Sequence, residues 1–218
     1  MNYKKIDLNN WERAEKFKYF TTAEDCVMSM TCDIDVTNFV AACKSKGLKF
    51  YSAFICAVSH VINSDEHFRM GRNGDGELVV FDRVNPLFTD FVPDGETFNN
   101  LTVPYDEDTL AMYESIEKVR EKYRGKEVMF PDEATDNMFS ITSLPWVNYS
   151  SFELHYVNAF MQLSPIVVWG KYKLKEGKLM LPLTLRVHHS VADGFHAARF
   201  FTRIDEVLPE IMNEIIEK

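Results

Sequence analysis

Motifs that would mark a nucleotide-binding or zinc-binding protein are missing from these 218 residues. There is no GxGxxG or GxxxxGK[ST] sequence to hold a dinucleotide or nucleoside triphosphate, and no HExxH or CxxC sequence to hold zinc. The N-terminus lacks a basic segment followed by an apolar run, and no apolar run is long enough to cross a bilayer. We therefore expect a cytoplasmic protein without a membrane contact, a metal or a prosthetic group.

Positive charge is also scarce, with 24 Lys and Arg against 33 Asp and Glu and a formal net charge of -9. Nucleic-acid binding relies on clustered Lys and Arg, so a general nucleic-acid surface is not expected. Disulfides are not expected either. The spacing of the four cysteines matches neither a zinc motif nor a small disulfide framework, and we expect reduced, packed side chains at Cys26, Cys32, Cys43 and Cys56.

The chain length and a hydrophobic content of 46% suit a single domain over residues 1–218, and no repeat or linker divides it. Strand and helix patterns mix without strict βαβ alternation. Helices are predicted over 10–20 with Asn10 as the cap, 37–47, 51–63, 106–124 and 195–217. Strands are predicted over 26–36, 68–72 and 78–81 as a hairpin, 87–91, 138–144, 154–163, 166–172 and 181–187. The helix over 106–124 shows no recognisable chemistry.

Two adjacent histidines lie where the last predicted strand ends, in the stretch LRVHHSVADGFHAARF. With Leu185 and Val187 facing a core, alternation turns His189 inward and His188 outward. Adjacent histidines do not have the spacing of a zinc pair. An inward imidazole that titrates near neutral pH can remove a proton from a hydroxyl or thiol, so His189 is the candidate general base. The alternative is a core histidine whose ring nitrogens are bonded to the backbone.

The sequence around these histidines, HHSVADG, fits HHxxxDG, the signature of coenzyme A-dependent acyltransferases. The chain resembles the trimeric chloramphenicol acetyltransferases much further, in family order and spacing, through MNYKKIDLNNWERAEKF, LKFYSAFI, FRM with GELVVFD, ETF, SLPWVNY, GKY, LPLTLRVHH and DGFHAARF. The resemblance implies an α/β two-layer sandwich with a mixed sheet and helices on one face. It also implies acetyl-CoA as co-substrate and a homotrimer with sites between subunits.

The resemblance also assigns catalytic roles. His189 is the base, and an ion pair between Arg13 and Asp193, expected to be bidentate, holds that base in place. Thr142 is expected to donate its hydroxyl hydrogen bond to the tetrahedral oxyanion. Ser140 and Ser143 are alternatives if the alignment shifts.

Ligand-binding residues follow from the same resemblance. The positions that line the coenzyme A tunnel are Lys49, Tyr51, Lys171 and Tyr172, with the two lysines as candidates for its phosphates. The positions that face the acceptor are Phe20, Glu24, Cys26 and Phe98.

Four positions depart from the family pattern, in which Phe20 is a tyrosine, Glu24 a leucine, Val92 a histidine and Ala192 a cysteine. A charged Glu24 in an apolar pocket is costly unless it is paired or points outward.

Chloramphenicol is the first acceptor expected, with another small hydroxyl or thiol compound as the alternative. A dihydrolipoamide acyltransferase core shares the signature, but we expect neither a lipoyl domain nor a Pro/Ala-rich linker ahead of residue 1, which argues against it. A non-catalytic ligand-binding trimer would not need the intact histidine, threonine and ion pair.

Overall fold

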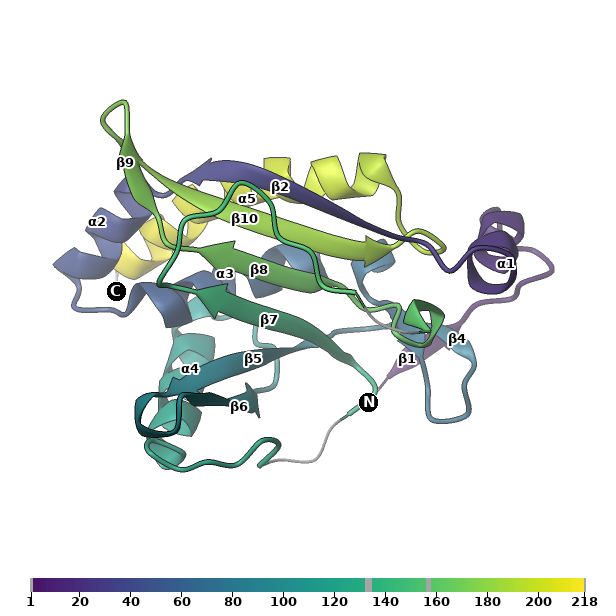
Figure 1. Ribbon diagram of the computed structural model, residues 1–218, viewed down its shortest axis with the longest axis horizontal. Coiled ribbons are helices and arrows are strands. Elements are labelled where there is room, and N and C mark those ends of the chain that lie inside the picture. Colours follow the sequence, from purple (N-terminus) through teal and green to yellow (C-terminus); the bar gives the residue numbers. More distant parts are fainter. Residues whose placement is uncertain (1, 132–134, 156–157, 218) are drawn as a thin grey trace.

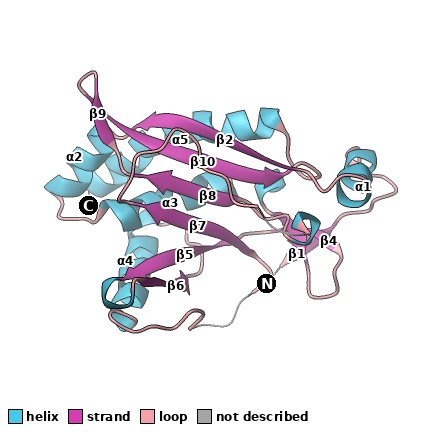
Figure 2. Ribbon diagram, in the orientation of Figure 1, coloured by secondary structure: helices cyan, strands magenta, loops and turns pink. Residues whose placement is uncertain are grey.

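A computed structural model describes residues 2–131, 135–155 and 158–217. Its main feature is a twisted mixed sheet with helices behind one face (Figures 1 and 2). Strands β5, β7 and β8 run parallel to one another, and the remaining pairs are antiparallel. The strand order is β2 (Val27–Asp35), β10 (Lys178–His188), β8 (Ile166–Gly170), β7 (Met138–Leu144), β5 (Asn85–Val92) and β6 (Thr97–Thr102), with β9 (Lys173–Lys175) paired to β10.

Four helices cover one face of this sheet, namely α2 (Thr37–Ser45), α3 (Phe50–Asn63), α4 (Thr109–Lys122) and α5 (Gly194–Glu217). The side chains of β10 that face them, Leu181, Leu183, Leu185 and Val187, are almost fully buried. Helix α3 is buried over most of its length because it packs between the sheet, α4 and α5. The predicted α/β sandwich with helices on one face is confirmed.

A second, three-stranded sheet lies at one end of the molecule, beside α1 (Ala14–Thr22). It consists of β1 (Tyr3–Lys5), β4 (Leu78–Phe81) and β3 (Met70–Arg72). The predicted hairpin accounts for β3 and β4, which pair antiparallel across the turn at residues 73–76. This end of the molecule also holds the carboxyl end of β10 and the turn at residues 188–193 that follows it, which we call the histidine turn. The N-terminal segment lies against this turn.

Three predictions of local structure are wrong. Helix α1 begins at Ala14, because Asn10 lies in a turn and donates its side-chain amide to Asp7. Residues 97–102 form β6, which was not predicted as a strand. In the predicted strand over 154–163, the described residues hold only a 3-10 helix, η3 (Ala159–Met161).

Two more 3-10 helices are η1 (Glu66–Phe68) and η2 (Pro93–Gly95). Among the described residues, no helix is long and apolar enough to span a membrane.

Candidate active site

Strand β10 ends at His188, and the chain then turns sharply into α5. His188 is fully buried, with Nε2 3.0 Å from Asp25 Oδ1 and Nδ1 2.7 Å from Ser190 Oγ. His189 is only partly buried. The prediction that His189 points inward and His188 outward is therefore wrong. His188 still follows the alternation of the strand, but the face of the strand on which it lies is covered at this position. The turn begins at His189, so the alternation no longer sets the direction of that side chain.

The His189 ring is held in a defined position with one nitrogen available. Its Nδ1 lies 3.2 Å from the carbonyl oxygen of Ala192, and its ring stacks on Phe20 at 4.3 Å between centroids. Its backbone N–H donates to the carbonyl of Cys26 at 2.9 Å. Within the described part of the chain, no group hydrogen-bonds to Nε2. A neutral imidazole that donates through Nδ1 presents the lone pair of Nε2, which is the form that a general base requires.

Arg13 ties the start of α1 to this turn. Its buried guanidinium donates to Asp193 Oδ2 at 3.0 Å, to the carbonyl of His189 at 2.9 Å and to the carbonyl of Ser190 at 3.0 Å. The expected bidentate contact is therefore wrong, because two of its donors bond to backbone carbonyls. Burial alone would raise the pKa of Asp193, but Arg13 and His196 lower it to about 2. The carboxylate is ionised at neutral pH.

Thr142 lies elsewhere, in the middle of the sheet. Its Oγ1 is 2.8 Å from Thr89 Oγ1, and it lines a largely apolar cavity of about 400 Å³. The other cavity residues are Tyr51, Thr89, Asp90, Phe91, Phe98, Arg120, Ser143, Leu144, Pro145 and Trp146. The alternative Ser143 also lines this cavity, whereas Ser140 does not.

Thr142 and His189 are not brought together within one chain. Thr142 pairs with Val168, which pairs with Thr184, so these three residues form one row across the sheet. Thr184 precedes His188 by four residues, or about 13 Å at about 3.3 Å per residue, and two strand spacings add about 10 Å sideways. A single acetyl group cannot contact both side chains of the same chain.

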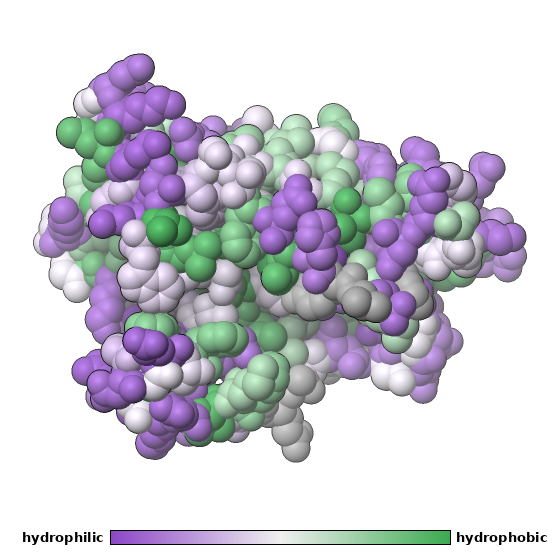
Figure 3. Space-filling view, in the orientation of Figure 1, coloured by the Kyte–Doolittle hydropathy of each residue, from purple (hydrophilic) through white to green (hydrophobic). Residues whose placement is uncertain are grey.

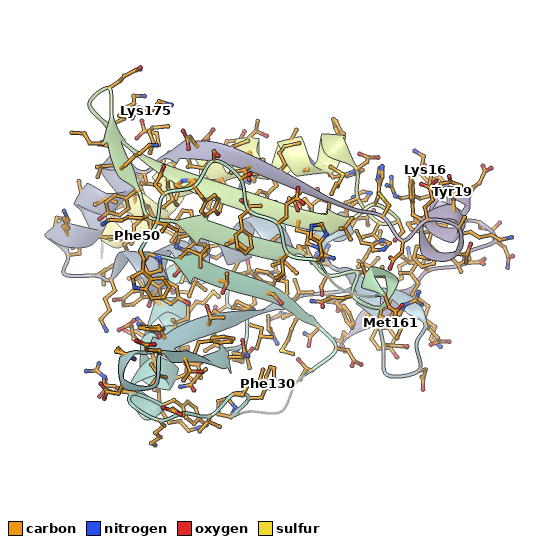
Figure 4. All side chains as sticks on the ribbon, viewed as in Figure 1. Lys16, Tyr19, Phe50, Phe130, Met161 and Lys175 are labelled. Atoms are coloured by element: carbon orange, nitrogen blue, oxygen red, sulfur yellow. The ribbon has the colours of Figure 1, made fainter. Side chains whose placement is uncertain are left out.

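The residues predicted to bind coenzyme A lie at the end of the sheet away from α1; Figure 4 shows Phe50 there and Tyr19 at the opposite end. The ammonium of Lys49 pairs with Glu117, and the hydroxyl of Tyr51 donates to the carbonyl of Thr89. The ring of Tyr172 meets Phe50 edge-on at 5.6 Å. Lys171 is exposed, and its backbone N–H donates to Val147 at 2.7 Å.

Arg120 is a cavity residue that the sequence prediction missed. It donates to Asp90 at 2.8 Å and to Glu117 at 2.9 Å, and its guanidinium lies 5.0 Å from the centre of the Tyr51 ring. The helix over 106–124 was predicted to carry no chemistry because its charges suggest a solvated surface. The available signal was Asp90, a charge within a strand, residues 87–92, whose other residues are apolar except for Thr89.

The predicted acceptor residues separate into two groups. Phe20 and Cys26 contact His189, through the ring stack and a backbone hydrogen bond. Phe98 is 45% exposed and lines the Thr142 cavity instead. Glu24 is exposed and accepts a hydrogen bond from the Tyr19 hydroxyl at 2.7 Å, so its charge is not buried within this chain. Of the departing positions, Ala192 lies in the histidine turn and Val92 ends β5.

Comparison with known proteins gives consistent results. A family model described as chloramphenicol acetyltransferase matches residues 1–205. Chloramphenicol acetyltransferase 3 of Escherichia coli is 38% identical over 208 residues, covering 95% of this chain and 97% of that protein. The chloramphenicol acetyltransferase of Staphylococcus aureus is 39% identical over 208 residues, with 95% and 96% covered.

Solved structures share the fold. A chloramphenicol acetyltransferase superposes with a TM-score of 0.87 at 21% identity, covering 95% of this chain and all of that one. A probable dihydrolipoamide acetyltransferase of Listeria monocytogenes superposes with a TM-score of 0.64 at 18% identity, with 95% of each chain covered. The family match and the relatives at 38–39% identity place the chain among acyltransferases. Within that class, it belongs to the chloramphenicol acetyltransferase family.

Proposed function

We propose that this acyltransferase is a chloramphenicol O-acetyltransferase that uses acetyl-CoA as its co-substrate and acts in the cytoplasm. The main support is the similarity to chloramphenicol acetyltransferases over 95% of the chain at 38–39% identity. The histidine turn adds support, because Arg13 and Asp193 hold a partly exposed imidazole with Nε2 available. No metal is required for this chemistry, since an imidazole and a hydroxyl donor suffice.

The proposed reaction is direct acetyl transfer in a ternary complex. Nε2 of His189 removes the proton of the acceptor hydroxyl as its oxygen attacks the thioester carbonyl. The hydroxyl of Thr142 donates to the oxyanion of the tetrahedral intermediate, a contact that typically contributes a few kcal/mol. The carbon–sulfur bond then breaks, and the imidazolium returns its proton to the departing thiolate. No acyl-enzyme forms.

The separation of His189 from Thr142 supports a site between two chains of a homotrimer. His189 of one subunit would face the Thr142 cavity of its neighbour, which supplies Phe98 and the coenzyme A residues Tyr51, Lys49, Tyr172 and Lys171. The face of the sheet that the helices leave uncovered is suited to such contacts (Figure 3), with exposed apolar side chains at Trp146, Val147 and Leu154. Exposed apolar surface of this kind is typical of interfaces.

The test is a thiol-release assay with acetyl-CoA and a panel of acceptors. The proposal predicts rapid release with chloramphenicol and formation of its O-acetyl ester. Release only with another alcohol would reject chloramphenicol as the acceptor, and release only with dihydrolipoamide would indicate the related acyltransferase reaction. No release with any acceptor, together with measurable acetyl-CoA binding, would indicate a non-catalytic ligand-binding trimer.

A further inference from the structure

Asp193 has a second partner that the ion pair with Arg13 does not explain. His196, in the first turn of α5, is buried and places Nδ1 2.8 Å from Asp193 Oδ1. The backbone N–H of Phe195 donates to the same oxygen at 3.2 Å. Arg13 binds the other oxygen, Oδ2. Each oxygen of the carboxylate therefore has its own donors, from α1 on one side and from α5 on the other.

The position of the His196 proton follows from these contacts. Nδ1 lies 2.8 Å from the carboxylate oxygen of Asp193, and the backbone N–H of Asp193 points at the same nitrogen from 3.1 Å. Without a proton, Nδ1 would accept from that N–H but would direct its lone pair at an ionised oxygen, which is repulsive. With a proton, Nδ1 donates a charge-assisted hydrogen bond to that oxygen, which is shorter and stronger than the contact with the neutral N–H. The geometry thus favours the tautomer with hydrogen on Nδ1.

A second imidazole lies against the first and favours its neutral form. His67, from η1, lies against His196 with 3.8 Å between ring centroids and a tilt of 37° between the ring planes. Nδ1 of His67 is 2.9 Å from Asp65 Oδ1, and Arg199 donates to the other oxygen of Asp65 at 2.9 Å. Two imidazolium rings at this distance would repel each other.

Several charges face His196. Burial, His67 and Arg13 lower the pKa of His196, while Asp193 opposes them, and the net direction is downward. The Phe195 ring contacts it edge-on at 5.6 Å. Two further charges act through His67, because the carboxylate of Asp65, at the N-cap of η1, contacts both His67 Nδ1 and the guanidinium of Arg199 on α5. His196 is thus a neutral hydrogen-bond donor at neutral pH.

We propose that His196 is a positioning residue for the catalytic base, because its Nδ1–H fixes Asp193 Oδ1 and thereby Arg13 and the backbone carbonyl of His189. The chain of contacts runs from His196 to Asp193, from Asp193 to Arg13, and from Arg13 to His189. His196 does not contact the reacting atoms in this scheme. The inference rests on the proposed acetyl transfer, since the effect of His196 is measured through catalysis by His189.

The test compares two substitutions that differ in their hydrogen-bonding group. His196→Leu removes the donor and keeps most of the volume, whereas His196→Asn keeps an N–H at the position of Nδ1. We expect His196→Leu to lower kcat about tenfold with little change in either KM, and His196→Asn to restore kcat to within about threefold of the wild type. An equal loss in both variants, or a kcat within twofold of wild type for His196→Leu, would overturn the proposal.

A matched control is His60→Leu. His60, on α3, is half-buried and hydrogen-bonds to Tyr105 at 3.0 Å and to Thr109 at 3.1 Å, away from the histidine turn. The His60→Leu variant should be less stable than the wild type and keep the wild-type kcat. If His60→Leu lowers kcat as much as His196→Leu, the effect is general destabilisation and the positioning role fails.

A measurement that does not depend on turnover completes the test. Nitrogen-15 spectra of the imidazoles at pH 7.5 should show the hydrogen of His196 on Nδ1. A hydrogen on Nε2 instead would overturn the proposal even if the enzyme is active. A wild-type protein that has the Nδ1–H tautomer but acetylates no acceptor would reject the proposed function and leave the His196 contact standing.

Discussion

The most informative single substitution for the histidine turn is Asp193→Asn. It keeps the shape of the side chain and removes the charge that pairs with Arg13 at 3.0 Å. The pKa of Asp193 falls from an ordinary 3.8 to about 2 in the folded chain, although burial alone would raise it. That difference corresponds to roughly 2 kcal/mol of folding free energy. Because the carboxylate is 28% exposed, solvent screening reduces the expected contribution to about 1–2 kcal/mol.

The pH range of this contribution follows from the sign of the shift. A carboxyl group whose folded pKa is lowered stabilises the protein above its unfolded pKa, and the stabilisation is lost as the pH falls from about 4 toward 2. Between pH 5 and pH 8, the wild type and Asp193→Asn should therefore differ by a constant amount. For a chain of this size, the expected fall in Tm is roughly 3–6 °C.

The assay is thermal and urea unfolding at pH 5, 6, 7 and 8, together with kcat at pH 7.5. Asp75→Asn is the control, because Asp75 is an exposed aspartate in the turn between β3 and β4 and loses the same charge. Asp193→Asn should lower both stability and kcat, whereas Asp75→Asn should change neither by much. A stability difference that disappears between pH 5 and pH 8 would refute the assignment of the effect to the ion pair.

Three further predictions concern the proposed reaction. His189→Ala should abolish acetyl transfer while the fold is retained by circular dichroism, and near-normal turnover would reject the base. Thr142→Ala should lower kcat about 100-fold, and Thr142→Ser should retain most of it because the hydroxyl donor remains; equal losses in both would argue for a packing role. Lys49→Gln should raise the KM for acetyl-CoA severalfold. Glu117→Gln should lower that KM, because it frees Lys49 from the carboxylate with which it pairs. An unchanged KM in both variants would show that Lys49 does not bind the phosphates.

The sequence predicted the sheet and its covering helices well, because the hydrophobic periodicity is strong where burial is strong. In β10, alternate leucines face the helices and are almost fully buried, so the pattern and the structure agree. The pairing of Arg13 with Asp193 came from the family resemblance, since nothing in local periodicity links positions 180 residues apart.

Other features were beyond local patterns. The orientation of the two histidines was predicted wrongly because β10 ends at His188 and the chain turns at residues 189–191, so the alternation does not extend to His189. The apolar residues at 154–163 suggested a strand, but among the described residues of this range Met161 is exposed and Leu163 is buried around a 3-10 helix. Arg120 was missed because its partner Asp90 lies on a different element, β5, 30 residues away in the sequence.

Subunit complementation tests the central claim most directly, namely that the base and the oxyanion donor act from different chains. Inactive His189→Ala and weakly active Thr142→Ala subunits are unfolded together in equal amounts, refolded and assayed. If each site takes His189 from one chain and Thr142 from its neighbour, about a quarter of the sites in the mixture are intact, and activity should rise far above that of either variant alone. Activity that stays at the average of the two separate variants would contradict the shared site.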